Sequence, residues 1–246
     1  MRYFRVTTAA LVLFFVSSIF GLSGCGEKQE PAKTSVVKQE AKAADTMTMA
    51  AQKVAEIPQT TAPAAEPSQA PITEERTFYD FEGDLLGWEV PSWAAGKTDH
   101  VAKEVVVSEE IASKGKSSMK VTADFPGGSW TAGLVEIQQF LDLSKYRVIR
   151  ADVYLPADAP IGLKAKLILT VGENWKFVEM NGGVPLMPGE WATISASIEP
   201  GSYDWKRVIP DEEFAKDIRK IAIRVESNNK PKYDGVFYVD NVRVGR

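Results

Sequence analysis

The sequence predicts an all-β fold, an antiparallel β-sandwich of the jelly-roll type, preceded by a signal peptide and a disordered tether. Apolar and polar residues alternate with a period of two in many short stretches, which is typical of strands with one buried face. Turn residues separate these stretches and no helical crossover lies between them, which favours antiparallel pairing. The alternating stretches are residues 116–125, 134–143, 147–156, 163–171, 191–199, 218–226 and 235–244.

The first 24 residues have the features of a bacterial lipoprotein signal. Arg2 and Arg5 precede an apolar run from Leu11 to Leu22, and "LSGC" follows, ending at Cys25. This resemblance implies removal of the peptide and attachment of lipid to the Cys25 thiol. An ordinary secretory peptide or a membrane anchor is the alternative, although the run is short for a span of about 20 residues. By analogy, Gly26 after the cysteine implies the outer membrane if the source is Gram-negative.

Residues 25–76 are predicted to be a lipidated cysteine followed by a tether. From Gly26 to about Arg76 the chain has no Trp, Phe or Tyr, and it is rich in Ala, Pro, Thr, Glu, Gln and Lys. Such a segment buries too little apolar area to offset its ordering entropy, so we expect disorder. About 50 residues of coil would have a dimension of roughly 40 Å. The tether would therefore hold the next domain away from a membrane.

The folded domain is predicted at residues 77–246, because every aromatic residue after the signal lies in that range. Alternation predicts that Ile221, Ile223 and Val225 face the core. It also predicts a polar outer face on one sheet, although scattered solvated positions are the alternative. That face would comprise Arg150, Asp152, Tyr154, Glu136, Gln138 and Arg224. One helical turn is predicted at residues 210–218, where a proline opens "PDEEFAKDI".

Composition and motifs exclude several kinds of chemistry. The chain has 29 basic and 33 acidic residues without a basic stripe, so we expect no nucleic-acid partner. His100 is the only histidine and no G-x-S-x-G motif accompanies it, which argues against a Ser–His hydrolase. Zinc sites built from Cys and His are excluded because the chain has one histidine and one cysteine, and that cysteine is expected to carry lipid. The acid pairs at 109–110 and 212–213 keep a glycoside hydrolase open as an alternative.

Three of the six tryptophans stand where no hydrophobic run could bury them. Trp93, Trp130 and Trp175 have Gly, Ser, Asn, Ala and Glu as neighbours, so we expect them near the surface. Trp88 and Trp191 are predicted to pack in the core or at a strand edge, and the position of Trp205 is left open.

Exposed aromatic rings indicate a binding partner, and a sugar ring is well suited to contact them. Its axial C–H groups stack on an indole ring, while its hydroxyls seek polar neighbours. Glu136, Gln138 and Arg224 are the candidate neighbours. Core packing is the alternative for each ring taken singly.

Four stretches resemble a carbohydrate-binding module of the galactose-binding-like jelly-roll superfamily. They are "FYDFEGDLLGW", "RADVYLP", "WKFVEMN" and "KYDGVFYVDNVRV". The nearest likeness is to the mannan-binding family twenty-seven, and it covers residues 77–246. The resemblance implies that Trp93, Trp130 and Trp175 form a platform for a β-mannan chain.

The same resemblance implies a structural calcium ion. Asp80 or Glu82 with Asp240 would supply carboxylates, and loop carbonyls at residues 114–116 would supplement them. The alternative is that these acids are ordinary turn or edge residues.

The sequence as a whole predicts a non-catalytic, monomeric lipoprotein that binds a polysaccharide at the bacterial cell envelope. Members of the resembled family usually sit beside a catalytic domain, and none is present in this sequence, which favours capture over hydrolysis. One alternative is an envelope structural or assembly lipoprotein that binds another protein. The other is a hydrolase with an unrecognised carboxylate pair.

Overall fold

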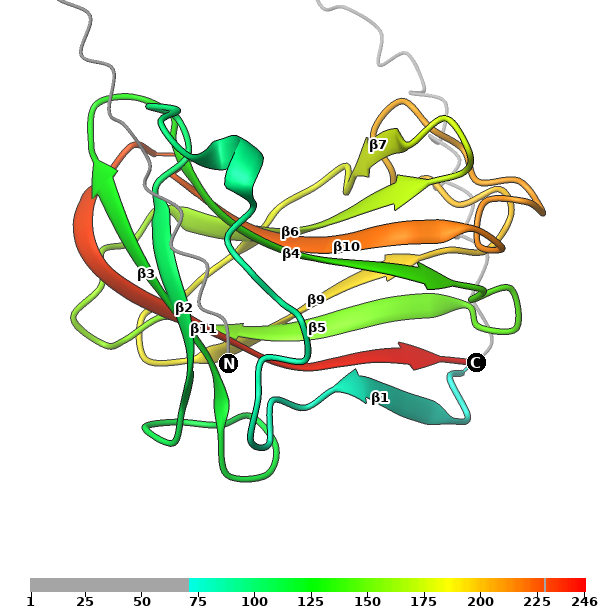
Figure 1. Cartoon of the computed structure of the whole chain (residues 1–246), viewed down its shortest axis with the longest axis horizontal. Helices are drawn as coiled ribbons and strands as arrows, with labels where there is room; N and C mark the ends of the chain where they lie inside the picture. The colour runs from blue at the N-terminus through cyan, green and yellow to red at the C-terminus, as the bar shows by residue number, and fades with distance from the viewer. Residues whose placement is uncertain (1–70, 228) are drawn as a thin grey trace, which may run out of the picture. The chain divides into compact units, whose positions relative to one another are not determined.

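The computed structural model describes residues 71–227 and 229–246. The predicted signal peptide, Cys25 and nearly all of the predicted tether lie outside the described residues. In the described part, two sheets form the layers of a sandwich, and every pair of neighbouring strands in them is antiparallel (Figure 1). The predicted all-β sandwich is therefore confirmed.

The first sheet has the order β2-β3-β11-β5-β9, and β1 also pairs with β11. The second sheet has the order β4-β10-β6-β7, and β8 also pairs with β6. The strands are β1 (Glu75–Tyr79), β2 (Ala102–Ser108), β3 (Ser118–Pro126), β4 (Ala132–Leu141), β5 (Val148–Tyr154), β6 (Leu163–Val171), β7 (Lys176–Glu179), β8 (Val184–Pro185), β9 (Trp191–Ser197), β10 (Ile218–Ser227) and β11 (Lys232–Gly245). A 3-10 turn, η1, spans Ser92–Ala94.

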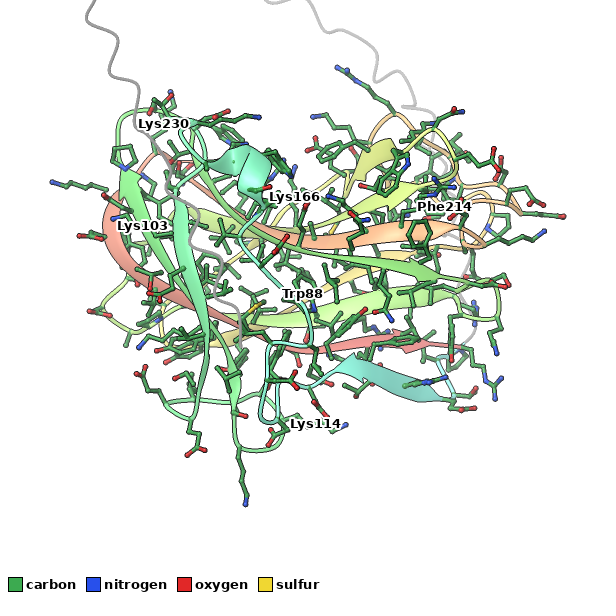
Figure 2. The ribbon with its side chains drawn as sticks, viewed as in Figure 1. Trp88, Lys103, Lys114, Lys166, Phe214 and Lys230 are labelled. Carbon is green, nitrogen blue, oxygen red and sulfur yellow. The ribbon has the colours of Figure 1, made fainter. Side chains whose placement is uncertain are left out.

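Alternating side chains from both sheets meet between the layers and form the core. Ile221, Ile223 and Val225 of β10 are buried there, as the alternation predicted. Trp88 is 2% exposed, and its ring meets those of Tyr79 and Phe81 edge-on. Figure 2 shows Trp88 between the two layers. Burial of such rings stabilises the fold, because each Å² of apolar surface removed from water contributes about 25 cal/mol.

Trp205, whose position the sequence left open, is also a core residue. It is 2% exposed, and its Nε1 donates a hydrogen bond to the Ser197 carbonyl at 2.7 Å. Trp191 is partly buried at the start of β9, where it packs on Tyr154 of β5 with ring centroids 5.4 Å apart. Trp88, Trp191 and Trp205 thus serve packing.

The helical turn predicted at residues 210–218 is wrong. The segment folds as hydrogen-bonded turns, in which Phe214 N–H donates to the Asp211 carbonyl at 3.2 Å. The carbonyl of Ala215 accepts instead from Leu143 N–H at 2.8 Å, and Phe214 and Ala215 are buried. Pairing with a distant segment therefore overrides the local helical preference.

The polar face predicted for one sheet is divided between two. Arg150, Asp152 and Tyr154 belong to β5 in the first sheet, whereas Glu136, Gln138 and Arg224 belong to β4 and β10 in the second. A period of two tells which side chains point inward, but not which sheet a strand joins. Strand pairing across long sequence separations decides that.

Strands β1, β2, β7 and β8 were not among the stretches that alternation identified. β2 carries the run "VVV" and β1, β7 and β8 are short, so none shows a sustained period of two. η1 and β7 lie on the same side of β4, β10 and β6, away from the layer of β5 and β11 (Figure 1). Within residues 71–227 and 229–246, no helix is long and apolar enough to cross a membrane.

Candidate functional site

Trp93, Trp130 and Trp175 are all partly open to solvent. They are 42%, 41% and 41% exposed respectively, in contrast to the buried Trp88 and Trp205. Trp93 lies in η1, Trp130 lies between β3 and β4, and Trp175 lies in the turn between β6 and β7. Each contacts at least one residue of β4 or β10, so the second sheet carries all three.

Trp93 is attached to the edge of this sheet through a carboxylate. Its Nε1 donates to Glu136 Oε1 at 3.3 Å, and Lys97 Nζ lies 4.6 Å from its ring centroid. His100 packs edge-on against the same ring, with centroids 4.8 Å apart. Burial lowers the pKa of His100, although Asp99 acts in the opposite direction. The only histidine therefore supports an aromatic ring, and its Nδ1 is buried without a hydrogen-bond partner among the described residues.

Trp130 follows a turn that only glycine can make easily. Gly127 and Gly128 have φ values of 79° and 73°, in the left-handed region. A Cβ at Gly127 would also lie 3.1 Å from the backbone nitrogen of Lys232. The guanidinium carbon of Arg224 lies 5.6 Å from the Trp130 ring centroid. The glycines around this tryptophan thus form the turn that places its ring beside β10.

Trp175 itself adopts the left-handed region, with φ of 52°. Its N–H donates to the Gly172 carbonyl at 3.0 Å, which closes the turn between β6 and β7. The ring meets Phe140 of β4 edge-on, and the guanidinium carbon of Arg219 lies 5.2 Å from its centroid. A bulky residue in this conformation is uncommon, because its side chain is strained there.

The strain at Trp175 can be measured with two substitutions that remove the ring equally. We expect Trp175→Gly to be more stable than Trp175→Ala by about 1 kcal/mol, because only glycine adopts a positive φ without steric cost. Urea unfolding of both variants measures the difference. Equal unfolding free energies would contradict the strained turn.

Between the three rings, the outer face of the second sheet has an apolar base. Leu134 of β4, Ala222 of β10 and Ile168 of β6 form a cluster separate from the main core, and each is less than 5% exposed. Side chains on a sheet's outer face are usually open to water. Long charged side chains must therefore cover this cluster.

These charged side chains form two groups of ion pairs, one centred on Arg224 and the other the pair Lys220–Glu136, which together we call the platform network. Arg224 Nη2 donates to Glu179 at 2.7 Å and to Glu226 at 2.9 Å. The other pairs are Lys166–Glu226 at 3.5 Å, Lys206–Glu179 at 2.5 Å and Lys220–Glu136 at 2.6 Å. Figure 2 shows Lys166 on the side of β6 and β10 opposite to Trp88.

Burial raises the pKa of Glu179, but hydrogen bonds from Lys206 and Arg224 outweigh it and leave the pKa below its usual value. The carboxylate is therefore ionised at neutral pH. Arg224 Nε is buried without a hydrogen-bond acceptor among the described residues. The platform network thus presents fixed donors and acceptors between the tryptophans.

The structure places all six predicted ligand-binding residues on the second sheet or in contact with it, Trp93 from η1 through Glu136. Gln138 is exposed and lies opposite Lys220 in the register. The sequence reasoning missed Glu179, Lys166, Lys220 and Glu226 as parts of one network. Alternation within "LKAKLILTV" could have indicated Lys166, but the pairing of Glu179 with Arg224 joins residues 45 positions apart.

Two of the three predicted calcium ligands, Glu82 and Asp240, lie against one loop, residues 113–117. Asp240 Oδ2 accepts hydrogen bonds from the N–H groups of Ser113 and Lys114, at 2.7 and 2.9 Å. Glu82 Oε1 accepts from Lys116 N–H at 2.7 Å, whereas Asp80 accepts from the N–H of Glu82. All three carboxylates therefore already accept hydrogen bonds from backbone N–H groups.

Calcium requires oxygen ligands, so this arrangement does not fit the ion as it stands. Among the described residues, no group of three or more His, Cys, Asp or Glu side chains is placed to hold a metal. Burial raises the pKa of Asp240, and the neighbouring Asp152 carboxylate adds to this effect. The calcium site stays a prediction.

The acid pairs considered for hydrolysis serve other contacts. Glu110 accepts a hydrogen bond from Lys120 Nζ at 2.6 Å and another from the Tyr238 hydroxyl. Glu213 pairs with Lys216 at 2.6 Å. Neither pair joins the platform network.

Among solved structures, a carbohydrate-binding module specific for non-crystalline cellulose, CBM28, matches with a TM-score of 0.50 at 17% identity, over 71% of this chain and 96% of that one. A Caldicellulosiruptor saccharolyticus module, CBM27-1 in complex with mannohexaose, matches with a TM-score of 0.49 at 18% identity, over 70% and 97%. A mannan-recognising module, TmCBM27, matches with a TM-score of 0.44 at 19% identity, over 72% and 97%. At 17% identity, the match to CBM28 shows a shared fold alone.

A search of curated proteins found no match. Comparison with protein families, however, matches residues 79–241 to the family described as "Mannanase, galactose-binding domain-like". This match runs from the end of β1 into β11 and includes every residue of the platform network. The chain therefore belongs to the mannanase galactose-binding-domain-like family.

Proposed function

We propose that this protein binds a polysaccharide, a β-mannan or a related glycan, without hydrolysing it. The observation that carries the proposal is the placement of Trp93, Trp130 and Trp175 around one sheet face, each about two-fifths exposed. Indole faces stack on the apolar faces of sugar rings. Family membership and the similarity in fold to modules that bind mannohexaose or cellulose support this choice.

The length of the site favours a chain of sugars over a single sugar. Arg219 lies over Trp175 and Arg224 over Trp130, and both arginines belong to β10. Five residues of strand span roughly 17 Å. The platform network lies along this span, where its carboxylates and cations can hydrogen-bond sugar hydroxyls.

Affinity electrophoresis on mannan, glucomannan and soluble cellulose tests the proposal. We expect Trp130→Ala and Trp175→Ala each to cost about 2 kcal/mol of binding, a decrease of about thirtyfold in affinity. Trp191→Ala is the matched control, because Trp191 lies on the other sheet, and it should leave retardation unchanged.

Other outcomes of this experiment favour the alternatives. Normal migration of the unaltered protein on every glycan would favour the envelope protein-binding role. Release of reducing sugar from any of the glycans would favour a hydrolase.

We also propose that the domain is carried at the bacterial cell envelope as a monomeric lipoprotein, with lipid on Cys25. The sequence before residue 71 supports this, through the signal-like residues 1–24 and the aromatic-free segment that follows. Metabolic labelling with a fatty-acid analogue, with Cys25→Ser as control, measures the modification. If Cys25→Ser carries as much label as the unaltered chain, the anchor is wrong.

A further inference from the structure

Phe177 is a large apolar side chain left open on the face that carries the tryptophans. It belongs to the edge strand β7 and is 56% exposed. Its register partner is Thr170 of β6, and Thr170 pairs in turn with Lys220 of the platform network. Among the described residues, no other aromatic ring packs against Phe177 and no cation lies over it. More than half of the Phe177 side chain is therefore open to a ligand.

A hollow of about 330 Å³ lies beside this ring. Its lining residues come from β7 and from the segment that follows Trp205. They are Lys176, Phe177, Glu179, Lys206, Arg207 and Val208. One apolar ring next to several long donors is the composition that sugar binding requires: a surface for C–H groups and hydrogen bonds for hydroxyls.

Glu179 connects this hollow to the site already described. One of its carboxylate oxygens accepts from Arg224 Nη2 at 2.7 Å and the other from Lys206 Nζ at 2.5 Å. Arg224 lies over Trp130, and Lys206 lines the hollow. The hollow therefore adjoins the platform network through Glu179.

The hydrogen-bond donors that line the hollow, Lys176, Lys206 and Arg207, can bind sugar hydroxyls. Among the described residues, Lys206 Nζ pairs with Glu179 alone, and its side chain is 48% exposed. Arg207 and Lys176 have no ion pair within residues 71–227 and 229–246. Arg207 also has a φ of 59°, a conformation that costs energy in a residue other than glycine.

We infer that Phe177, with Lys206 and Arg207, forms a fourth sugar-binding subsite, which extends the tryptophan platform across the β7 edge. This inference rests on the proposed function. The subsite takes one further sugar unit of the same chain, stacked on Phe177 with its hydroxyls toward the two cations. It determines the length of glycan that the protein prefers.

Calorimetric titration of the unaltered protein and of Phe177→Ala with manno- and cello-oligosaccharides of four to six units tests the inference. We expect the unaltered protein to gain about fivefold in affinity as the ligand lengthens to the additional subsite, the range of one aromatic contact. Phe177→Ala should lose this gain while its affinity for the shorter ligands stays the same. Phe177→Tyr should keep the gain, because its ring is also flat.

Ile161→Ala is the control, since Ile161 is 71% exposed and does not line the hollow. If Phe177→Ala and the unaltered protein show the same dependence on ligand length, while Trp130→Ala loses binding, the subsite is overturned and the proposed function stands. If the unaltered protein binds neither series, both are overturned. Equal loss at every length would also contradict a separate subsite.

Discussion

Replacing Arg224 with alanine is expected to lower the free energy of unfolding by about 4 kcal/mol. Arg224 donates to Glu179 and Glu226, and these three side chains are only 10%, 14% and 7% exposed. Removing the cation leaves two poorly hydrated carboxylates, each with one lysine: Lys206 beside Glu179 and Lys166 beside Glu226. In a domain of this size the thermal midpoint should fall by about 10 °C. Urea unfolding and thermal melts measure both quantities.

Arg219→Ala is the matched control, because Arg219 also lies over a site tryptophan but pairs with Asp217 at the end of the sheet. We expect a clearly smaller loss, since ion pairs nearer to water contribute little. Arg224→Lys should fall between the two, because one ammonium group cannot hold both carboxylates as the guanidinium fork does. Equal stabilities of Arg224→Ala and Arg219→Ala would contradict the buried network.

Replacing Asp240 with alanine is expected to cost about 3 kcal/mol, because buried N–H groups left without an acceptor cost about 1–3 kcal/mol each. Asp240 is fully buried and accepts from the N–H groups of Ser113, Lys114 and Asn241. Asp240→Asn should lose less, since its amide oxygen can still accept from the loop and the repulsion with Asp152 disappears. Denaturant unfolding of the two variants gives the comparison.

Thermal melts of the unaltered protein and of Asp240→Ala decide whether calcium binds at this position. If the ion binds there, EDTA should lower the thermal midpoint of the unaltered protein and calcium should restore it, because a ligand that binds only the folded state stabilises it. In Asp240→Ala neither addition should have an effect. An unchanged midpoint of the unaltered protein in EDTA would leave hydrogen bonds alone to hold residues 113–117.

Much of the fold could be predicted from local pattern. The stretch "LKAKLILTV" coincides with β6, and the inward positions of β10 and β5 are buried as the alternation indicated. The prediction of a helical turn at 210–218 was wrong. The acids and the proline there favour a helix locally, but the backbone of the segment pairs with Leu143. Local preference decides an element only where no distant partner competes for its hydrogen bonds.

The candidate site could be predicted only as separate pieces. Trp93, Trp130 and Trp175 stood out because glycine and polar neighbours could not bury them, and the structure leaves each partly exposed. The sequence named Glu136, Gln138 and Arg224 as their polar neighbours, but not which ring each would meet or which other charges lie between the rings. Glu179 meets Arg224, and Trp93 meets Glu136, through strand pairings that no local pattern encodes.

The sequence by itself determined the all-β class, the inward faces of the central strands and the three unburied tryptophans. Each of these depends on residues within a few positions of one another, where steric preference and a period of two act directly. The sequence placed Glu136 and Arg224 on one face, and only the tertiary structure decided that Arg150 and Asp152 lie on the other sheet. It also decided that Phe177 adjoins the hollow beside Lys206. These relations depend on which distant strands pair, and hydrophobic burial over the whole domain selects that pairing.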